Sequence, residues 1–146
     1  MGSKMPVSLD NLMIYIIREY TRRTYKGIGR TKLMKLLFLI DYHAFKEKGK
    51  KITGLKWIKW LYGPFSRKVL DTLDALEAEG KIYAEEIPGL GVFYISSYYN
   101  VNISENVRKM VDEVLKEYAT KSLDYILTKV YNLPEVKNKD VGDYIL

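Results

Sequence analysis

The sequence predicts a mainly α fold that carries one small β-hairpin. Several long segments place apolar side chains at helical spacing, and one of them, residues 33–40, is apolar nearly all round, which is typical of a core helix. Two short segments rich in β-branched and aromatic residues flank a Pro/Gly turn at residues 88–91, as in a hairpin. The chain has 146 residues, 47% of them hydrophobic, so we expect a single domain with a core of its own over residues 1–146.

Two helices are expected in the N-terminal part of the chain. The first covers about residues 9–25, with Ser8 or Asp10 as its N-cap, and the glycine-containing segment 26–29 interrupts it. The second covers about residues 31–48 and ends at a glycine. Because it is the most apolar helix, we expect it to lie at the centre of the core.

A short third helix is expected over residues 57–61, where Trp57 and Trp60 stand three positions apart. A Gly-Pro turn follows, and the proline is suited to the first turn of a helix. A fourth helix is expected over residues 66–79, with leucines facing inward and Gly80 as its C-terminal cap.

The hairpin is expected over residues 81–87 and 91–96, and two further helices lie within residues 104–131. The last dozen residues are expected to be irregular. Helices followed by a hairpin, or wing, predict a winged-helix-like centre over about residues 9–97, with residues 104–131 as a C-terminal helical extension.

Composition excludes several classes of protein. The chain has no cysteine, which excludes disulfides and zinc sites built on thiolates, and its single histidine, His43, excludes a multi-histidine metal site within one chain. No nucleophile motif, phosphate-binding loop or cluster of metal-binding carboxylates is present. We therefore expect a protein that is not an enzyme and uses no cofactor.

The longest uninterrupted aliphatic and aromatic run, residues 36–40, is far shorter than the roughly 20 residues that span a bilayer. Without an apolar signal segment at its N-terminus, the protein is expected in the cytoplasm, with no membrane contact. Residues 1–4 are expected to be an addition ahead of a start at Met5. The absence of Gln and Cys, with abundant Lys, Glu, Ile and Tyr, is typical of a thermophile.

Charge is distributed unevenly along the chain, whose net charge is +6. Residues 1–68 contain 16 Lys and Arg against 4 Asp and Glu, whereas residues 69–146 contain 8 against 14. Such polarity steers an anionic partner to one face. Nucleic acid and an acidic protein both fit, and so does a surface that is simply covered with solvated lysines.

For DNA, the fourth helix would present Ser66, Arg67 and Lys68 to the base edges and phosphates. Acidic residues along the rest of that helix and in the wing, such as Glu85 and Glu86, oppose deep insertion into a groove. Most basic residues lie upstream of this helix, and we call them the basic stripe. A phosphate backbone could lie across the stripe, or its side chains could cover an apolar core. Its members are Arg18, Arg22, Arg23, Lys26, Arg30, Lys32, Lys35, Lys46, Lys48, Lys50, Lys51, Lys56 and Lys59.

Two tryptophans allow a further alternative. Trp57 and Trp60, with Tyr62 beside them, could form a stacking platform for single-stranded nucleic acid. Aromatic residues at helical spacing also pack into cores, and the sequence leaves both interpretations open.

A family resemblance favours one class of partner. The block KLMKLLFLIDYH at residues 32–43, followed by a lone glycine, ITG and then YGPFS at residues 62–66, resembles the Panacea family of SocA-like antitoxin domains. The likeness covers about residues 9–85, with a weaker echo at residues 131–134. Phe65 and Ser66 depart from the family pattern, in which many members carry Val and a second Pro after YGP.

The resemblance implies a non-enzymatic module that neutralises a cognate toxin by direct binding. It implies that Tyr62, Gly63 and Pro64 shape the turn, and that Asp41 and His43 orient the second helix or line a contact surface. We therefore predict an antitoxin-like regulatory module with a toxin-like protein partner. The alternative is a winged-helix transcriptional regulator that binds double-stranded DNA. The amphipathic helices within residues 104–131 could also form a homodimer.

Overall fold

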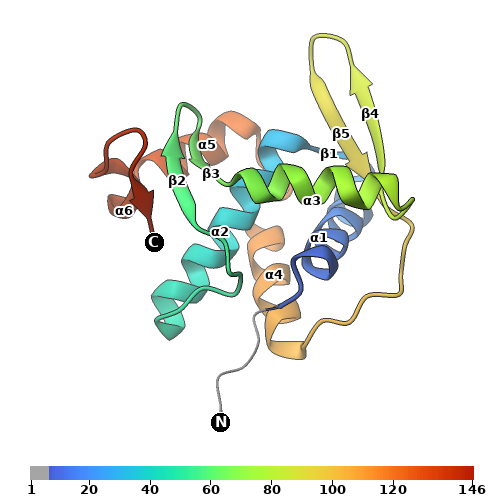
Figure 1. Cartoon of the computed structure of the whole chain (residues 1–146), viewed down its shortest axis with the longest axis horizontal. Coiled ribbons are helices and arrows are strands. Elements are labelled where there is room, and N and C mark those ends of the chain that lie inside the picture. The colour runs from blue at the N-terminus through green and yellow to red at the C-terminus, as the bar shows by residue number, and fades with distance from the viewer. Residues whose placement is uncertain (1–6) are drawn as a thin grey trace.

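The computed structural model describes residues 7–146, so the expected addition at residues 1–4 lies outside the described residues. Helices predominate over strands (Figure 1). None of the helices in the described part of the chain combines the length and apolarity that a bilayer span requires. The helices are α1 Leu9–Thr24, α2 Arg30–Lys48, α3 Arg67–Ala78, α4 Glu105–Tyr118, α5 Leu123–Tyr131 and α6 Pro134–Lys137.

The strands within residues 7–146 form two small antiparallel sheets of three strands each. One has the order β1-β5-β4, and Ile28 of β1 pairs with Tyr94 of β5. The other has the order β3-β2-β6, and Trp57 of β2 pairs with Ile145 of β6. The strands are β1 Ile28–Gly29, β2 Trp57–Trp60, β3 Gly63–Phe65, β4 Tyr83–Ile87, β5 Gly91–Ile95 and β6 Tyr144–Ile145.

Helix α2 lies at the centre of the core, as its apolar sequence predicts. Its side chains from Leu33 to Asp41 are all buried, and α4, α5, β3 and β5 all contact the helix. Ser8 accepts a hydrogen bond from a backbone nitrogen in the first turn of α1, which confirms it as the N-cap, and Ser104 and Ser122 cap α4 and α5 in the same way. One hydrophobic cluster includes side chains from all six helices.

The short helix expected over residues 57–61 is wrong, because this segment is strand β2 followed by a turn. Trp57 is fully buried with its ring edge-on to Phe38, whereas Trp60 is half exposed. Two tryptophans three apart suggest a helix, but a four-residue segment rich in aromatic and β-branched residues is equally typical of a strand. Pairing with β3 on one side and with β6, far along the chain, on the other decides for the strand.

The end of the chain also differs from expectation. Residues 134–137 form α6, and β6 near the C-terminus pairs with β2, so the last dozen residues are not irregular. The expected hairpin is confirmed as β4 and β5, with β1 as a third strand that the sequence analysis missed. In Figure 1 the β2–β3 and β4–β5 hairpins project on the same side, near opposite ends of α3. With a strand in place of the third helix, the winged-helix arrangement of the centre is not confirmed.

Candidate interaction surface

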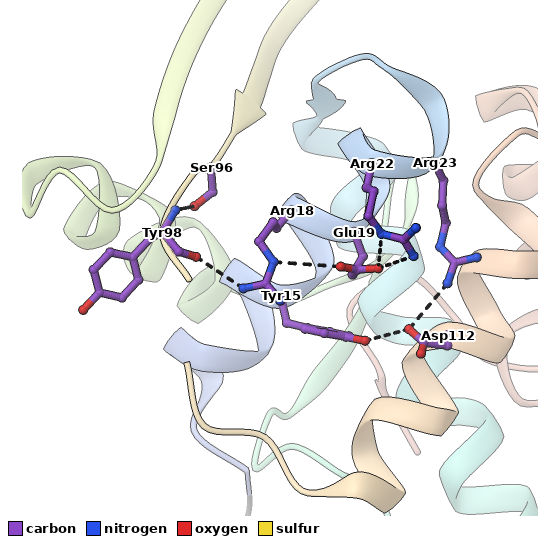
Figure 2. A network of polar contacts seen from close by, with 8 residues as sticks. All are labelled: Tyr15, Arg18, Glu19, Arg22, Arg23, Ser96, Tyr98 and Asp112. Atoms are coloured by element: carbon purple, nitrogen blue, oxygen red, sulfur yellow. Dashed lines mark hydrogen bonds and ion pairs between the residues drawn. The ribbon is translucent and has the colours of Figure 1, made fainter. Parts of the chain in front are cut away.

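Glu19 pairs with two arginines of the basic stripe (Figure 2). Its nearly buried carboxylate accepts a hydrogen bond from Nε of Arg22 at 2.8 Å and lies 3.9 Å from Nε of Arg18. Arg18 also donates from Nη1 to the carbonyl oxygen of Tyr98 at 3.4 Å and lies 4.7 Å from the ring centroid of Tyr99. Both guanidinium groups therefore have partners within the chain.

Asp112 on α4 pairs with the third arginine of α1 (Figure 2). Its Oδ1 lies 3.6 Å from Nη2 of Arg23 and accepts a 2.8 Å hydrogen bond from the hydroxyl of Tyr15. Burial, together with the hydrogen bond to Asp112, raises the pKa of the Tyr15 hydroxyl well above its ordinary value. The contacts of Asp112 therefore connect α1 to α4.

Other cations of the stripe also donate to oxygen atoms within the chain. These bonds connect segments far apart in sequence, which favours the interpretation that the stripe covers and braces the core. The pairs are Arg30 with the Tyr94 hydroxyl (2.9 and 2.7 Å), Lys32 with the carbonyls of Ala119 (2.9 Å) and Lys121 (2.7 Å), Lys46 with Glu135 (2.8 Å), and Lys59 with the carbonyl of Lys139 (2.7 Å).

The proposed DNA-contacting residues at the start of α3 do not share one environment. Ser66 is buried, whereas Arg67 and Lys68 are exposed. Nε of Arg67 lies 3.6 Å from a carboxylate oxygen of Asp71, one helical turn later. Lys56, also predicted to bind nucleic acid, is exposed before β2. The DNA alternative therefore depends on a few exposed cations and stays a prediction.

Asp41 is a fully buried carboxylate at the centre of a hydrogen-bond network. It accepts hydrogen bonds from the backbone nitrogens of Ile52 and Thr53, both at 3.0 Å. The Thr53 hydroxyl and the indole nitrogen of Trp57, at 2.9 Å, also donate to it. Asp41 thus connects α2 to the segment that leads into β2. His43, two residues later, is half-buried and is not among these donors.

The turn that contains the YGP motif is held from two helices. Gly63 has φ +93°, a conformation that residues with a Cβ rarely adopt. Next to it, the carbonyl of buried Pro64 accepts a hydrogen bond from Nζ of Lys35 on α2 at 2.9 Å. The hydroxyl of Tyr131 on α5 donates to the carbonyl of Leu61 at 2.6 Å. The turn is therefore anchored by side chains on both sides.

At this turn the chain exposes three consecutive large apolar side chains, which we call the hairpin tip: Trp60, Leu61 and Tyr62, with exposed fractions of 49%, 66% and 70%. A mostly apolar cleft of about 170 Å³, the hairpin cleft, opens at its foot. The hairpin cleft is lined by Arg30, Thr31, Met34, Lys35, Trp60, Tyr62, Gly63, Phe65 and Leu70.

No group of three or more His, Asp or Glu residues among residues 7–146 is placed to hold a metal ion.

The family described as Antitoxin SocA-like, Panacea domain, matches residues 33–135. The chain belongs to this family. The match begins within α2, includes the hairpin tip, and ends within α6. It thus reaches further towards the C-terminus than the likeness in the sequence suggested, and it begins later. No curated protein and no solved structure matches the chain.

Within this Panacea domain, sequence reasoning missed the residues that support the YGP turn. The sequence places Lys35 only in the basic stripe, and Tyr131 only in the weak family echo near residues 131–134. A lysine within an otherwise apolar helical segment, such as Lys35 among residues 33–40, is the signal for a buried amine. The exposure of Leu61 has no such signal, because it depends on the strand that replaced the expected helix.

Proposed function

We propose that this Panacea domain is a non-enzymatic regulator that acts as an antitoxin does, by binding a partner protein directly. The family match supports the antitoxin role. Direct contact with a partner protein is supported above all by the hairpin tip, where three large apolar side chains in succession are exposed to solvent. Clustered exposed apolar side chains of this kind mark sites of protein–protein contact.

The construction of the tip supports the same proposal. A hairpin held by Lys35, Tyr131 and the pairing of β2 with β6 is already ordered before a partner arrives. Binding then loses little conformational entropy, which leaves more of the contact energy for affinity. Trp and Tyr, which lie on either side of Leu61, are also the residue types that most often dominate binding energy at interfaces.

Co-expression with the product of each neighbouring gene tests the proposal. We expect one such product to arrest growth, and this chain to restore growth and to co-purify with it. The test compares Leu61→Ser with Leu90→Ser, because both leucines lie at hairpin turns and are similarly exposed, at 66% and 71%. Leu61→Ser should weaken binding by at least about tenfold, whereas Leu90→Ser should bind as the wild type does.

Two outcomes would contradict the proposal. If no neighbouring product is neutralised, the antitoxin role fails. If a product is neutralised equally well by the wild type and by Leu61→Ser, the role stands but the hairpin tip is not the contact. Both substitutions are at exposed positions, so each variant should remain within about 0.5 kcal/mol of the wild type in stability.

A further inference from the structure

The volume of the hairpin cleft limits what it can hold. Its free volume is about 170 Å³. Pockets for cofactors and drug-sized ligands usually range from about 300 to 1,000 Å³. A space of this size suits one large side chain, as in the pockets that receive anchor residues at protein interfaces.

The walls of the cleft determine which kind of side chain fits. Met34 of α2, Phe65 of β3 and Leu70 of α3 contribute apolar surface, and the aromatic side chain of Trp60 also lines the cleft. An apolar side chain that enters would be removed from water, and this burial of apolar surface favours binding. The walls therefore favour an aliphatic or aromatic anchor.

Two cations line the same cleft, and no Asp or Glu is among its lining residues. Lys35 is 3% exposed, and its ammonium group, which has three protons to donate, has the Pro64 carbonyl as its hydrogen-bond acceptor within the described chain. Burial lowers the pKa of Lys35 to about 8, because the charged amine has lost most of its hydration. Arg30, the second cation, uses Nε and Nη2 to bind the Tyr94 hydroxyl.

A buried ammonium group of this kind is stabilised by a carboxylate that enters with an apolar anchor. The carboxylate supplies a charged hydrogen-bond acceptor and a compensating charge, and hydrogen bonds between two charged groups are stronger than those between neutral ones. Charge complementarity thus distinguishes an acidic segment from a neutral one of the same shape.

We infer that the hairpin cleft binds a short acidic segment of the partner protein, with an apolar side chain in the cleft and a neighbouring carboxylate paired with Lys35 and Arg30. The identity of the partner rests on the proposed function, whereas the chemistry of the segment rests on the cleft itself. The hairpin tip would cover the segment from one side.

The first test uses the wild-type protein and three tripeptides as probes: acetyl-Glu-Leu-Glu-amide, acetyl-Gln-Leu-Gln-amide and acetyl-Glu-Ser-Glu-amide. Binding is followed by NMR at the two indole N–H signals. Trp60 lines the cleft, whereas Trp57 is buried and hydrogen-bonded to Asp41, so Trp57 is an internal control. A Trp60→Phe variant assigns the signals.

We expect Glu-Leu-Glu to shift the Trp60 signal in a saturable way and to leave the Trp57 signal in place. The peptides that lack the carboxylates or the leucine should bind at least about tenfold more weakly. Equal binding of Glu-Leu-Glu and Gln-Leu-Gln would overturn the assignment of an acidic segment. No shift with any peptide up to about 10 mM would overturn the cleft as a binding site.

The second test compares Lys35→Met with Lys59→Met. Each lysine donates to a backbone carbonyl, but Lys59 is not among the residues that line the cleft. Lys35→Met should abolish the preference for Glu-Leu-Glu over Gln-Leu-Gln, and Lys59→Met should retain it. If Lys35→Met does not fold, the peptide comparison on the wild type still decides.

The outcomes separate this inference from the proposed function. A neutralised partner that binds Lys35→Met and the wild type equally well would overturn the inference and leave the function intact. Specific peptide binding without any neutralised partner would support the cleft and contradict the function. A concentration-dependent dimer that Lys35→Met disrupts would replace the partner segment with a second copy of this chain.

Discussion

At the scale of single residues, Asp41 organises the segment that enters β2. Burial raises the pKa of its carboxyl group, while the hydrogen bonds from Thr53, Trp57 and Ile52 oppose that rise. Each of these donors would otherwise be left without an acceptor in a region closed to water, which costs roughly 1–3 kcal/mol for each group. One side chain therefore determines the path of the chain after α2.

We predict that Asp41→Asn lowers the free energy of unfolding by about 2–4 kcal/mol, because the amide NH₂ would face groups that are themselves donors. Urea denaturation measures the change. His43→Ala is the matched control on the same helix, and it should cost less than about 1 kcal/mol because His43 is half-buried and does not donate to Asp41. Equal losses in the two variants would show that the network does not depend on the Asp41 carboxylate.

Lys35 leads to a prediction about pH. Its pKa is lowered from the ordinary 10.5 to about 8 in the folded protein, so the unfolded chain binds more protons between these values. Burial of the charged Lys35 amine therefore lowers the stability of the folded protein fully below pH 8. This loss of stability disappears as the pH rises towards 10.5, because the amine then loses its proton. Relative to Lys35→Met, the wild type should gain about 2 kcal/mol in stability between roughly pH 7 and 9.5. Urea titrations of both proteins at these two pH values measure the difference, and a difference independent of pH would contradict a buried charged amine.

At the scale of elements, the β2–β3 hairpin depends on segments from much of the chain. β2 pairs with β3 on one side and with β6 on the other. Its turn contacts Lys35 of α2 and Tyr131 of α5, and Gly63 supplies the positive φ. A Cβ at position 63 would meet its neighbours at ordinary contact distances of 3.6 to 3.9 Å, so space does not explain the glycine, whereas the backbone conformation does.

We predict that Gly63→Ala lowers stability by about 1–3 kcal/mol through backbone strain. Gly54→Ala is the control, because a Cβ there meets nothing within 4 Å and its φ is not in the left-handed region. Thermal unfolding compares the two, and amide hydrogen exchange in β2 and β3 should show faster opening of the hairpin in Gly63→Ala alone. Equal stability of both variants would show that the turn adapts to a Cβ.

At the scale of the whole molecule, part of the excess positive charge in the first half of the chain joins that half to the second half. Arg23 pairs with Asp112, Lys46 pairs with Glu135, and Lys32 donates to carbonyls after α4. The dipolar charge distribution therefore acts in part within the fold, and fewer cations remain to contact a separate anion.

We accordingly expect only weak, non-selective binding to genomic DNA fragments, lost as salt rises. Replacing Arg67 and Lys68 with alanine should not change which fragments are retained. Replacing Arg108 and Lys109 on α4 provides the control, because they form another adjacent, exposed Arg–Lys pair. A titration with salt on all three proteins is the measurement. Tight, sequence-selective binding that only the Arg67/Lys68 variant loses would instead support the winged-helix regulator.

Much of the fold was predictable from the sequence because it depends on local pattern. Helices at α1, α2, α3, α4 and α5 follow from apolar spacing and from their caps, and the β4–β5 hairpin follows from its Pro/Gly turn. The family was also recognisable from the YGP turn and the segment before it. These features depend on neighbours a few positions apart, whose preferences the sequence displays directly.

Only the tertiary structure decided the features on which the candidate site depends. Residues 57–60 form a strand that lies between β3 and the distant β6, and the hairpin tip at the β2–β3 turn is thereby exposed. Lys35 became a buried amine because the turn at Pro64 packs over it, and several cations of the basic stripe brace the fold because acceptors from distant segments lie opposite them. Such outcomes depend on contacts between positions tens of residues apart. A local pattern in the sequence does not indicate which distant segment of the chain will make these contacts.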